Sequence, residues 1–265
     1  MNLTTGKLLG ILAPFFVFGI VATIWHLVVV WFKIPSIILP SPIAVLNALW
    51  LERMVLLKAS WVTLQAATVG LICSALFGSF IAVAFSQSSL LRVSLYPYVI
   101  FLQTVPIVAI APLLIIWSGN NFRTIVLVAT IISIFPVIAN VTSGLLSINE
   151  NLRELFRMQS ATRLQMLTKL RIPAAIPQLV LGLRISSGLA VIGAIIAEFF
   201  VGNSGQYDGL GTIMTSRQAN LKTAELIAAL IACTGLGILL FGFVNLLGST
   251  VLRRWTRVSG FESDK

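Results

Sequence analysis

The chain has 265 residues, of which 58% are hydrophobic and 10% are charged, and its mean hydropathy is +1.01. Soluble domains carry roughly 25% charged residues, so this composition indicates a protein that crosses a membrane several times. The net charge of +10 would suit a nucleic-acid-binding protein, but Lys and Arg lie between apolar segments, where such residues set membrane orientation. We therefore expect no nucleic-acid partner.

Six apolar segments are long enough to span a bilayer, since a hydrocarbon core of about 30 Å needs roughly 20 residues of helix. They are residues 8–32, 61–86, 94–117, 123–146, 178–201 and 226–252. The first is too long for the apolar part of a signal peptide, so we expect it to remain as a span. We expect an all-α polytopic membrane protein, a bundle of about six transmembrane helices that forms a single domain, residues 1–265. Because Pro97, Pro106 and Pro112 fall in the third span, it should be the least regular.

An even number of spans places both termini on one side of the membrane. With the termini in the cytosol, eleven Lys and Arg residues lie on the cytosolic side and six on the outer side, with Arg184 just inside the fifth span. This asymmetry favours cytoplasmic termini. It also places the long loop at residues 147–177 in the cytosol. Near the span ends, tryptophans are expected to form an interfacial belt: Trp25, Trp31, Trp50, Trp61 and Trp117.

The loop at residues 147–177 has the pattern of two short amphipathic helices. Apolar and charged residues alternate at helical spacing over 152–159, with Asn149 and Asn151 as candidate N-caps. A second helical run, residues 163–171, follows a break at 160–162 and is expected to end before Pro173. Three uses stay open at this point: fixing orientation, lying on the lipid surface, or docking into a groove of a partner.

The loop resembles the E-A-A, three residues, G, nine residues, I-x-L-P motif of binding-protein-dependent ABC importer permeases. Glu154 falls on the first position, Ser160 on the glycine and residues 170–173 (LRIP) on the closing I-x-L-P. Leu155 and Phe156 replace the two alanines, and the serine replaces a residue that takes positive φ freely.

Two further segments resemble the nitrate, sulfonate and taurine branch of that family. Residues 38–42 (ILPSP) look like the LPSP stretch after the first span, and residues 197–211 look like the AE…GLG stretch that closes the fifth. Residues 206–208 (QYD) are an insertion relative to that stretch.

The resemblance implies a permease that works as a pair, with a cytosolic ABC ATPase dimer and an extracytoplasmic solute-binding protein, in the inner (plasma) membrane of a bacterium. Its partners would be those proteins, a second permease copy in a homodimer and membrane lipid. The chain has no G-x-x-x-x-G-K-[ST] sequence, so ATP and Mg²⁺ would bind to the ATPase and the chain itself would hold no cofactor or metal and be no enzyme. The residues expected to contact the ATPase are Arg153, Glu154, Phe156, Arg157, Ser160, Ala161, Thr162, Arg163, Ile172 and Pro173.

Candidates for the translocation pathway are Gln103 and Thr104, which are polar residues beside Pro106, and Glu198, an acidic residue well inside an apolar run. Glu198 could instead be structural, pairing with a neighbour near the outer end of its span. The cargo would be a small solute, either sulfonate-, taurine- or nitrate-like or similar to a thiamine precursor or riboflavin. The alternative is a secondary transporter or channel with a basic cytosolic loop, which should show internal repeats or several buried charges.

Overall fold

The computed structural model describes residues 3–201 and 208–258, and within these ranges every regular element is helical. In chain order the helices are α1 (Leu3–Trp31), α2 (Pro42–Leu51), α3 (Arg53–Gln87), α4 (Ser89–Thr104), α5 (Ile107–Ser118), α6 (Phe122–Leu146), α7 (Glu150–Met158), α8 (Arg163–Met166), α9 (Ile172–Val201), α10 (Leu210–Ala219) and α11 (Thr223–Val258). A π-helical segment, Leu167–Arg171, joins α8 to α9. The expected all-α class is confirmed.

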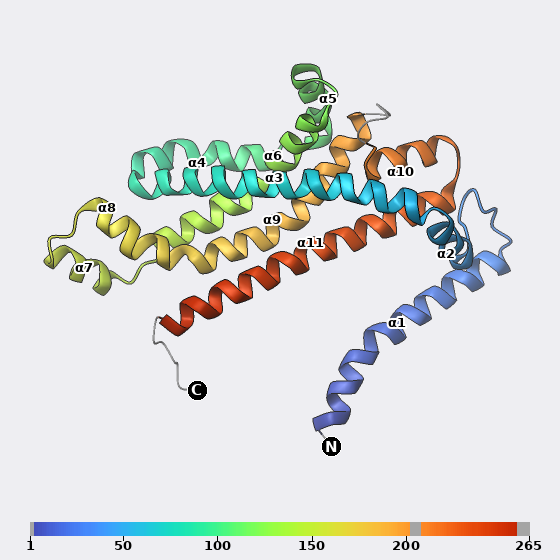
Figure 1. Cartoon of the computed structure of the whole chain (residues 1–265), viewed down its shortest axis with the longest axis horizontal. Helices are drawn as coiled ribbons and strands as arrows, with labels where there is room; N and C mark the ends of the chain where they lie inside the picture. The colour runs from blue at the N-terminus through green and yellow to red at the C-terminus, as the bar shows by residue number, and fades with distance from the viewer. Residues whose placement is uncertain (1–2, 202–207, 259–265) are drawn as a thin grey trace.

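All six expected spans fall on helices, and four of them are long and apolar enough to cross a membrane: Arg53–Gln87, Phe122–Leu146, Arg163–Val201 and Thr223–Leu252. The expected third span is a bent pair, α4 and α5, which would make a fifth crossing if counted as one. The expected first span lies on α1, where Phe16–Trp31 is a shorter apolar helix. Helix α1 contacts α2 and slants away from the other helices (Figure 1).

The bend between α4 and α5 measures 99°. Val105, which precedes Pro106, has an extended backbone (φ −70°, ψ 127°), as expected for the residue before a proline. Pro97 and Pro112 lie inside α4 and α5 without breaking them. The sequence therefore predicts the irregular span correctly, and the structure shows that one of its three prolines makes the break.

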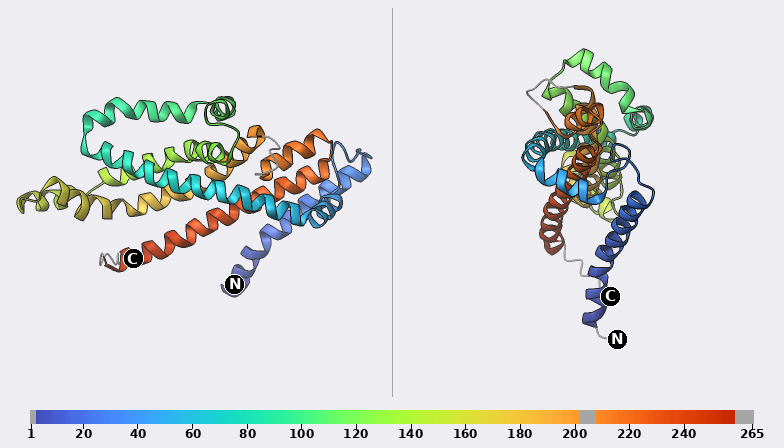
Figure 2. Two further views of the ribbon diagram at one scale, coloured as in Figure 1. Left: turned by 45° about the horizontal axis from the view of Figure 1, so that its top comes forward. Right: turned by 90° about the vertical axis from the view of Figure 1, so that its right-hand side faces the viewer.

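Helices α3, α6 and α9 form the centre of the bundle, with α6 and α9 in the longest contact (Figures 1 and 2). Glycines bring the backbones close together. A Cβ atom on Gly193 would lie 2.8 Å from the Cα of Ala129, and a Cβ atom on Gly70 would lie 2.7 Å from the Cβ of Ala129. The Ser186 hydroxyl donates to the Ser133 carbonyl at 2.6 Å. Small residues and interhelical hydrogen bonds are what hold helices together in lipid.

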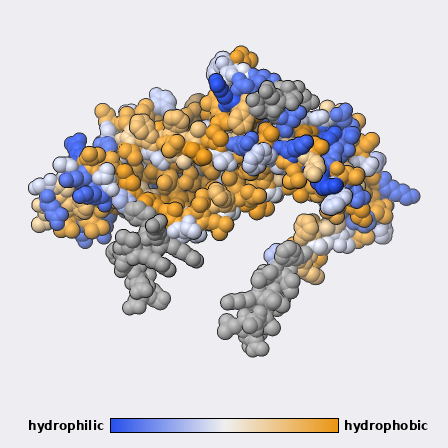
Figure 3. Space-filling view, viewed as in Figure 1, coloured by the Kyte–Doolittle hydropathy of each residue, from blue (hydrophilic) through white to orange (hydrophobic). Residues whose placement is uncertain are grey.

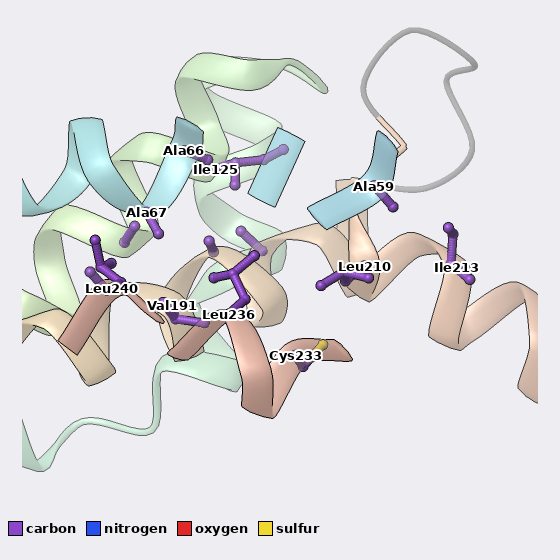
Figure 4. Close-up of a cluster of buried hydrophobic side chains, with 14 of the residues drawn as sticks. Ala59, Ala66, Ala67, Ile125, Val191, Leu210, Ile213, Cys233, Leu236 and Leu240 are labelled. Carbon is purple, nitrogen blue, oxygen red and sulfur yellow. The ribbon is translucent and has the colours of Figure 1, made fainter. Parts of the chain in front are cut away.

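The larger buried cluster joins α3, α6, α9, α10 and α11, with one residue each from α2 and α5 (Figure 4). Figure 4 shows Ala59, Leu210, Ile213 and Cys233 on its α10 side. Hydrophobic residues cover the middle of the molecular surface, while hydrophilic residues gather at its two ends (Figure 3). We call these the loop end, around α7 and α8, and the α10 end, around α2 and α10.

The sequence predicts that the second helix of the loop ends before Pro173, and this prediction is wrong. Instead, the helix runs on from Arg163 to Val201. The Ile172 amide donates to the Leu167 carbonyl, five residues back, which widens the turn. The wider turn makes room for the Pro173 ring, which in an α-helix would clash with the carbonyl four residues earlier.

We expect Gly193→Ala to lower the stability of the detergent-solubilised protein by about 1–3 kcal/mol, because the added methyl group overpacks the contact with α6. Gly188→Ala, on the same helix, is the matched control, since a Cβ atom there would meet no neighbouring atom within 4 Å. Thermal unfolding of both variants checks this. Equal midpoints would show that the α6–α9 contact has room for a further methyl group, which would contradict this close packing.

Candidate functional site

The loop end begins with the short helix α7. The Asn149 side chain caps it by accepting from the Asn151 amide at 3.0 Å, so Asn149 is the cap of the two candidates. Glu150 lies in the first turn and pairs with Arg153 at 3.2 Å, and Arg157 lies in the last turn. These charges complement the helix dipole and stabilise a helix of only nine residues.

Ser160 ends α7 in a left-handed backbone conformation, with φ of 54°. The Ala161 amide donates to the Phe156 carbonyl at 3.0 Å and the Ser160 amide donates to the Arg157 carbonyl at 2.9 Å. These are the two bonds of a Schellman motif, in which the residue with positive φ is usually glycine. The position where the family motif has glycine is therefore the position where the backbone favours it.

Thr162 starts the next helix with a capping box. Its hydroxyl accepts from the Gln165 amide at 3.2 Å, and the Gln165 side chain accepts from the Thr162 amide at 2.8 Å. Residues 160–162 therefore form a tight turn between two capped helices, as the sequence predicts.

Both helices leave apolar side chains on the surface. Leu155 is 48% exposed, Met158 84% and Leu164 68%. Phe156 is half-buried, and Glu154, Arg157 and Arg163 are exposed. A patch of this kind beside basic residues marks a surface that another molecule could cover.

The base of the loop is anchored in the bundle. Leu167 packs on a buried cluster of Ala82, Val137, Val141, Leu145 and Ala175, which belong to α3, α6 and α9. The Arg171 guanidinium donates to the Ser86 carbonyl at 2.6 Å. This bond ties the loop to the end of α3, where the chain turns into α4. Sequence reasoning did not assign Arg171, because its partner lies 85 residues away.

At the α10 end, the Glu198 carboxylate is fully buried between α3 and α10. It lies 2.9 and 3.0 Å from the Thr63 hydroxyl, which donates to it, and accepts from the Gly211 amide at 2.8 Å. The Thr63 hydroxyl in turn accepts from the Leu210 amide at 2.9 Å. Glu198 and Thr63 thus cap the first amides of α10 from two other helices.

The glycines of the GLG stretch leave room for this carboxylate. A Cβ on Gly209 would lie 2.1 Å from the Cδ of Glu198, and one on Gly211 would lie 2.5 Å from the Ile195 carbonyl oxygen. The AE…GLG pattern therefore encodes a close contact between the end of α9 and the start of α10. The expected insertion at residues 206–208 begins outside the described residues, since 202–207 are not described.

An ion cluster fixes the other end of α10. Arg217 contacts Glu52, at the corner between α2 and α3, at 2.7 Å, and Glu225 on α11 at 2.9 Å, and Lys222 contacts Glu225 at 3.1 Å. Burial raises the pKa of Glu52, the neighbouring Glu225 raises it further, and Arg217 opposes both. Arg217 therefore keeps two close carboxylates together.

The candidate residues do not form one site. Ile172 and Glu198 lie roughly 40 Å apart along α9, at about 1.5 Å per residue. Gln103 and Thr104 are exposed at the end of α4, beside the α4–α5 bend. The chain thus has a loop end, a bend in the third span and a buried carboxylate, three separate places. Among the described residues no group of His, Cys, Asp or Glu could hold a metal ion.

A family profile described as "Binding-protein-dependent transport system inner membrane component" matches residues 74–257. The chain belongs to this family. It is an inner-membrane ABC permease subunit, a transport component rather than an enzyme. This membership sets aside the alternative of a secondary transporter or channel.

Curated relatives agree with the family. The chain is 32% identical to a "Probable ABC transporter permease protein" of Haemophilus influenzae, over 89% of this chain and 95% of that one. It is 29% identical to the "Formylaminopyrimidine transport permease protein ThiX" of Halalkalibacterium halodurans (91% and 95% covered). It is 28% identical to the "Putative aliphatic sulfonates transport permease protein SsuC" of Bacillus subtilis (94% and 88% covered).

The fold of this permease resembles a solved chain of the MetNI methionine ABC transporter, with a TM-score of 0.61. The two share 19% identity, and the match covers 77% of this chain and 98% of that one. At this identity the likeness supports the fold, an ABC importer permease bundle.

We expect Ser160→Gly to slow hydrogen exchange of the α7 amides about fivefold, because glycine removes about 1 kcal/mol of left-handed backbone strain. Ser147→Gly is the control: this serine of the same loop has φ of −82°, so glycine there relieves nothing. Exchange measured by mass spectrometry in detergent checks both. Faster exchange in Ser160→Gly would contradict the left-handed turn.

We expect Glu198→Ala to lower the free energy of unfolding by about 1–3 kcal/mol, since it leaves the Gly211 amide without its buried acceptor, whereas the Thr63 hydroxyl keeps the Ala59 carbonyl at 3.2 Å. Glu154→Ala, which removes an exposed carboxylate, should leave stability unchanged. Thermal unfolding and the cargo concentration for half-maximal uptake are measured together. A shifted half-maximal concentration with unchanged stability would instead place Glu198 in the pathway.

Proposed function

We propose that this permease is the pore-forming subunit of an ATP-driven importer and that the loop at residues 147–177 couples it to a cytosolic ABC ATPase. The observation that carries the proposal is the Schellman turn at Ser160, which falls in the register of the family motif. It holds two capped helices with exposed apolar side chains at the far end of a long helix that enters the bundle.

The loop end suits docking into a cleft of the ATPase. Leu155 and Met158 present apolar surface, and Arg153, Glu154, Arg157 and Arg163 surround it with charge. An amphipathic helix of this kind binds a partner by inserting its apolar face into a groove. The turn between the two helices, from Phe156 to Ala161 and Thr162, determines the angle between them. Helix α9 begins at Ile172 and Pro173.

Movement at the loop would reach the pore through its base. Leu167 is packed on the cluster of α3, α6 and α9, and Arg171 holds the end of α3. Closure of an ATP-bound ATPase dimer would draw the two loops of a permease pair together and shift the pore from inward-facing to outward-facing. Each nucleotide state must then prefer one pore state by a few kcal/mol.

In this arrangement both termini and the loop are cytoplasmic, and the α10 end meets an extracytoplasmic solute-binding protein. A second copy of this chain completes the pore, while ATP and Mg²⁺ bind only to the ATPase. The bend between α4 and α5 is the best candidate for the pathway, because discontinuous helices line the sites of many transporters. Gln103 and Thr104 offer polar groups there.

The cargo is a small organic or inorganic solute. Relatives of similar identity are named for a formylaminopyrimidine and for aliphatic sulfonates, so the permease sequence favours neither class. Selection would lie mainly with the binding protein. Calorimetry of the solute-binding protein that co-purifies with this permease, against both classes of solute, tests which class it carries.

Two variants separate docking from transmission. We expect Leu155→Asp to abolish co-purification of the ATPase, because it puts a charge into the apolar face. We expect Arg171→Ala to retain the ATPase and its hydrolysis but to lower uptake per ATP about tenfold or more, since a charged hydrogen bond contributes about 1.5–3 kcal/mol. Co-purification, ATP hydrolysis and uptake in proteoliposomes give the three readouts.

Controls for both variants are available in the same loop. Leu155→Met keeps an apolar side chain at the same exposed position and should retain the ATPase. Arg171→Lys keeps a donor near Ser86 and should restore part of the uptake. Normal assembly and uptake in Leu155→Asp would refute docking at this face, and normal uptake in Arg171→Ala would refute transmission through this bond.

A further inference from the structure

A groove of about 500 Å³ opens at the α10 end, between the first half of α3 and the facing side of α11. Its walls are mostly apolar and include Leu57, Trp61, Leu64 and Leu236. Arg53 is the one charged residue that lines it, and Ser60 adds a hydroxyl. Both α3 and α11 are among the helices that are long and apolar enough to span the membrane.

The groove has the length of one leaflet of a bilayer. Arg53 is the first residue of α3, and Leu64 lies about 16 Å further along the helix at about 1.5 Å per residue. Half of a hydrocarbon core of about 30 Å is nearly the same distance. An acyl chain that starts from a headgroup on Arg53 would therefore reach about as far as Leu64.

Arg53 is held in position at the mouth of the groove. One guanidinium nitrogen donates to the Trp50 carbonyl at 2.7 Å, and the guanidinium lies 4.6 Å from the centre of the Trp50 ring. The adjacent carboxylate, Glu52, is engaged by Arg217 instead. An arginine has five N–H donors, so Arg53 keeps donors free for the oxygens of an anion.

We propose that the groove binds an anionic phospholipid of the leaflet at the α10 end, with its phosphate on Arg53 and an acyl chain along Trp61 and Leu64. Charge complementarity at the mouth distinguishes this occupant from an apolar helix of a second copy, which would bring no anion to the guanidinium. The proposal needs only that the helices cross a membrane, and it holds whether or not the loop couples to an ATPase.

The test is native mass spectrometry of the delipidated transporter, with its ATPase subunits, after incubation with equal amounts of phosphatidylglycerol and phosphatidylethanolamine of the same chain length. We expect one phosphatidylglycerol per permease chain, retained about fivefold over phosphatidylethanolamine, the preference that one basic residue gives near an anionic lipid. Arg53→Ala should abolish the preference, Arg53→Lys should keep it, and Lys58→Ala, which removes an exposed charge outside the groove, should leave it intact.

Ser60→Phe fills the groove and should lower retention of both lipids while leaving the dimer intact. Equal retention of the two lipids by the unchanged protein, or an equal loss of preference in Arg53→Ala and Lys58→Ala, overturns the proposal. Loss of the dimer in Ser60→Phe with lipid retention unchanged also overturns it, because a second copy then occupies the groove. Thermal unfolding of each variant confirms that it is folded.

Discussion

Close packing of α9 against α6 is the contact on which the other parts of this structure depend. Lipid is as apolar as the side chains, so helices in a membrane gain little from burial and rely on close approach and hydrogen bonds. Gly193 lets the backbones meet at Ala129, and the Ser186 hydroxyl bonds to a carbonyl of α6. Since α9 continues into the loop at one end and carries Glu198 at the other, its position determines where both lie.

Features made by neighbouring residues could be predicted from the sequence. The break at 160–162 and the cap before α7 each depend on side chains and carbonyls within five positions along the chain. The register of the family motif also pointed to Ser160, and the turn there has the backbone that glycine favours. Contacts between distant segments could not be predicted. Thr63 and Glu198 lie 135 positions apart, so the sequence identified an unusual carboxylate without showing what it binds.

Prolines show the same limit from another side. The residue before a proline avoids the helical backbone, which predicts a boundary at every proline in an apolar run. Only the packing decides which boundary forms. At Pro106 the chain breaks by 99°, whereas at Pro173 a π-helical turn absorbs the missing donor and the helix continues into the bundle. The proposed coupling requires an unbroken helix, because a hinge at Pro173 would let the loop move without moving α9.

The two ends of the bundle are held by different chemistry, and the difference suits a transporter driven from one side. At the α10 end, a buried carboxylate caps α10 and Arg217 joins Glu52 to Glu225, so several charged bonds must break before that end can rearrange. At the loop end, an apolar cluster and the Arg171 bond to Ser86 hold the base. Apolar contacts are non-directional and tolerate sliding, whereas bonds to buried charges do not. Under the proposed coupling, a force applied at the loop would therefore move α9 as a lever about its far end, with the largest displacement at the loop end and the smallest beside Glu198.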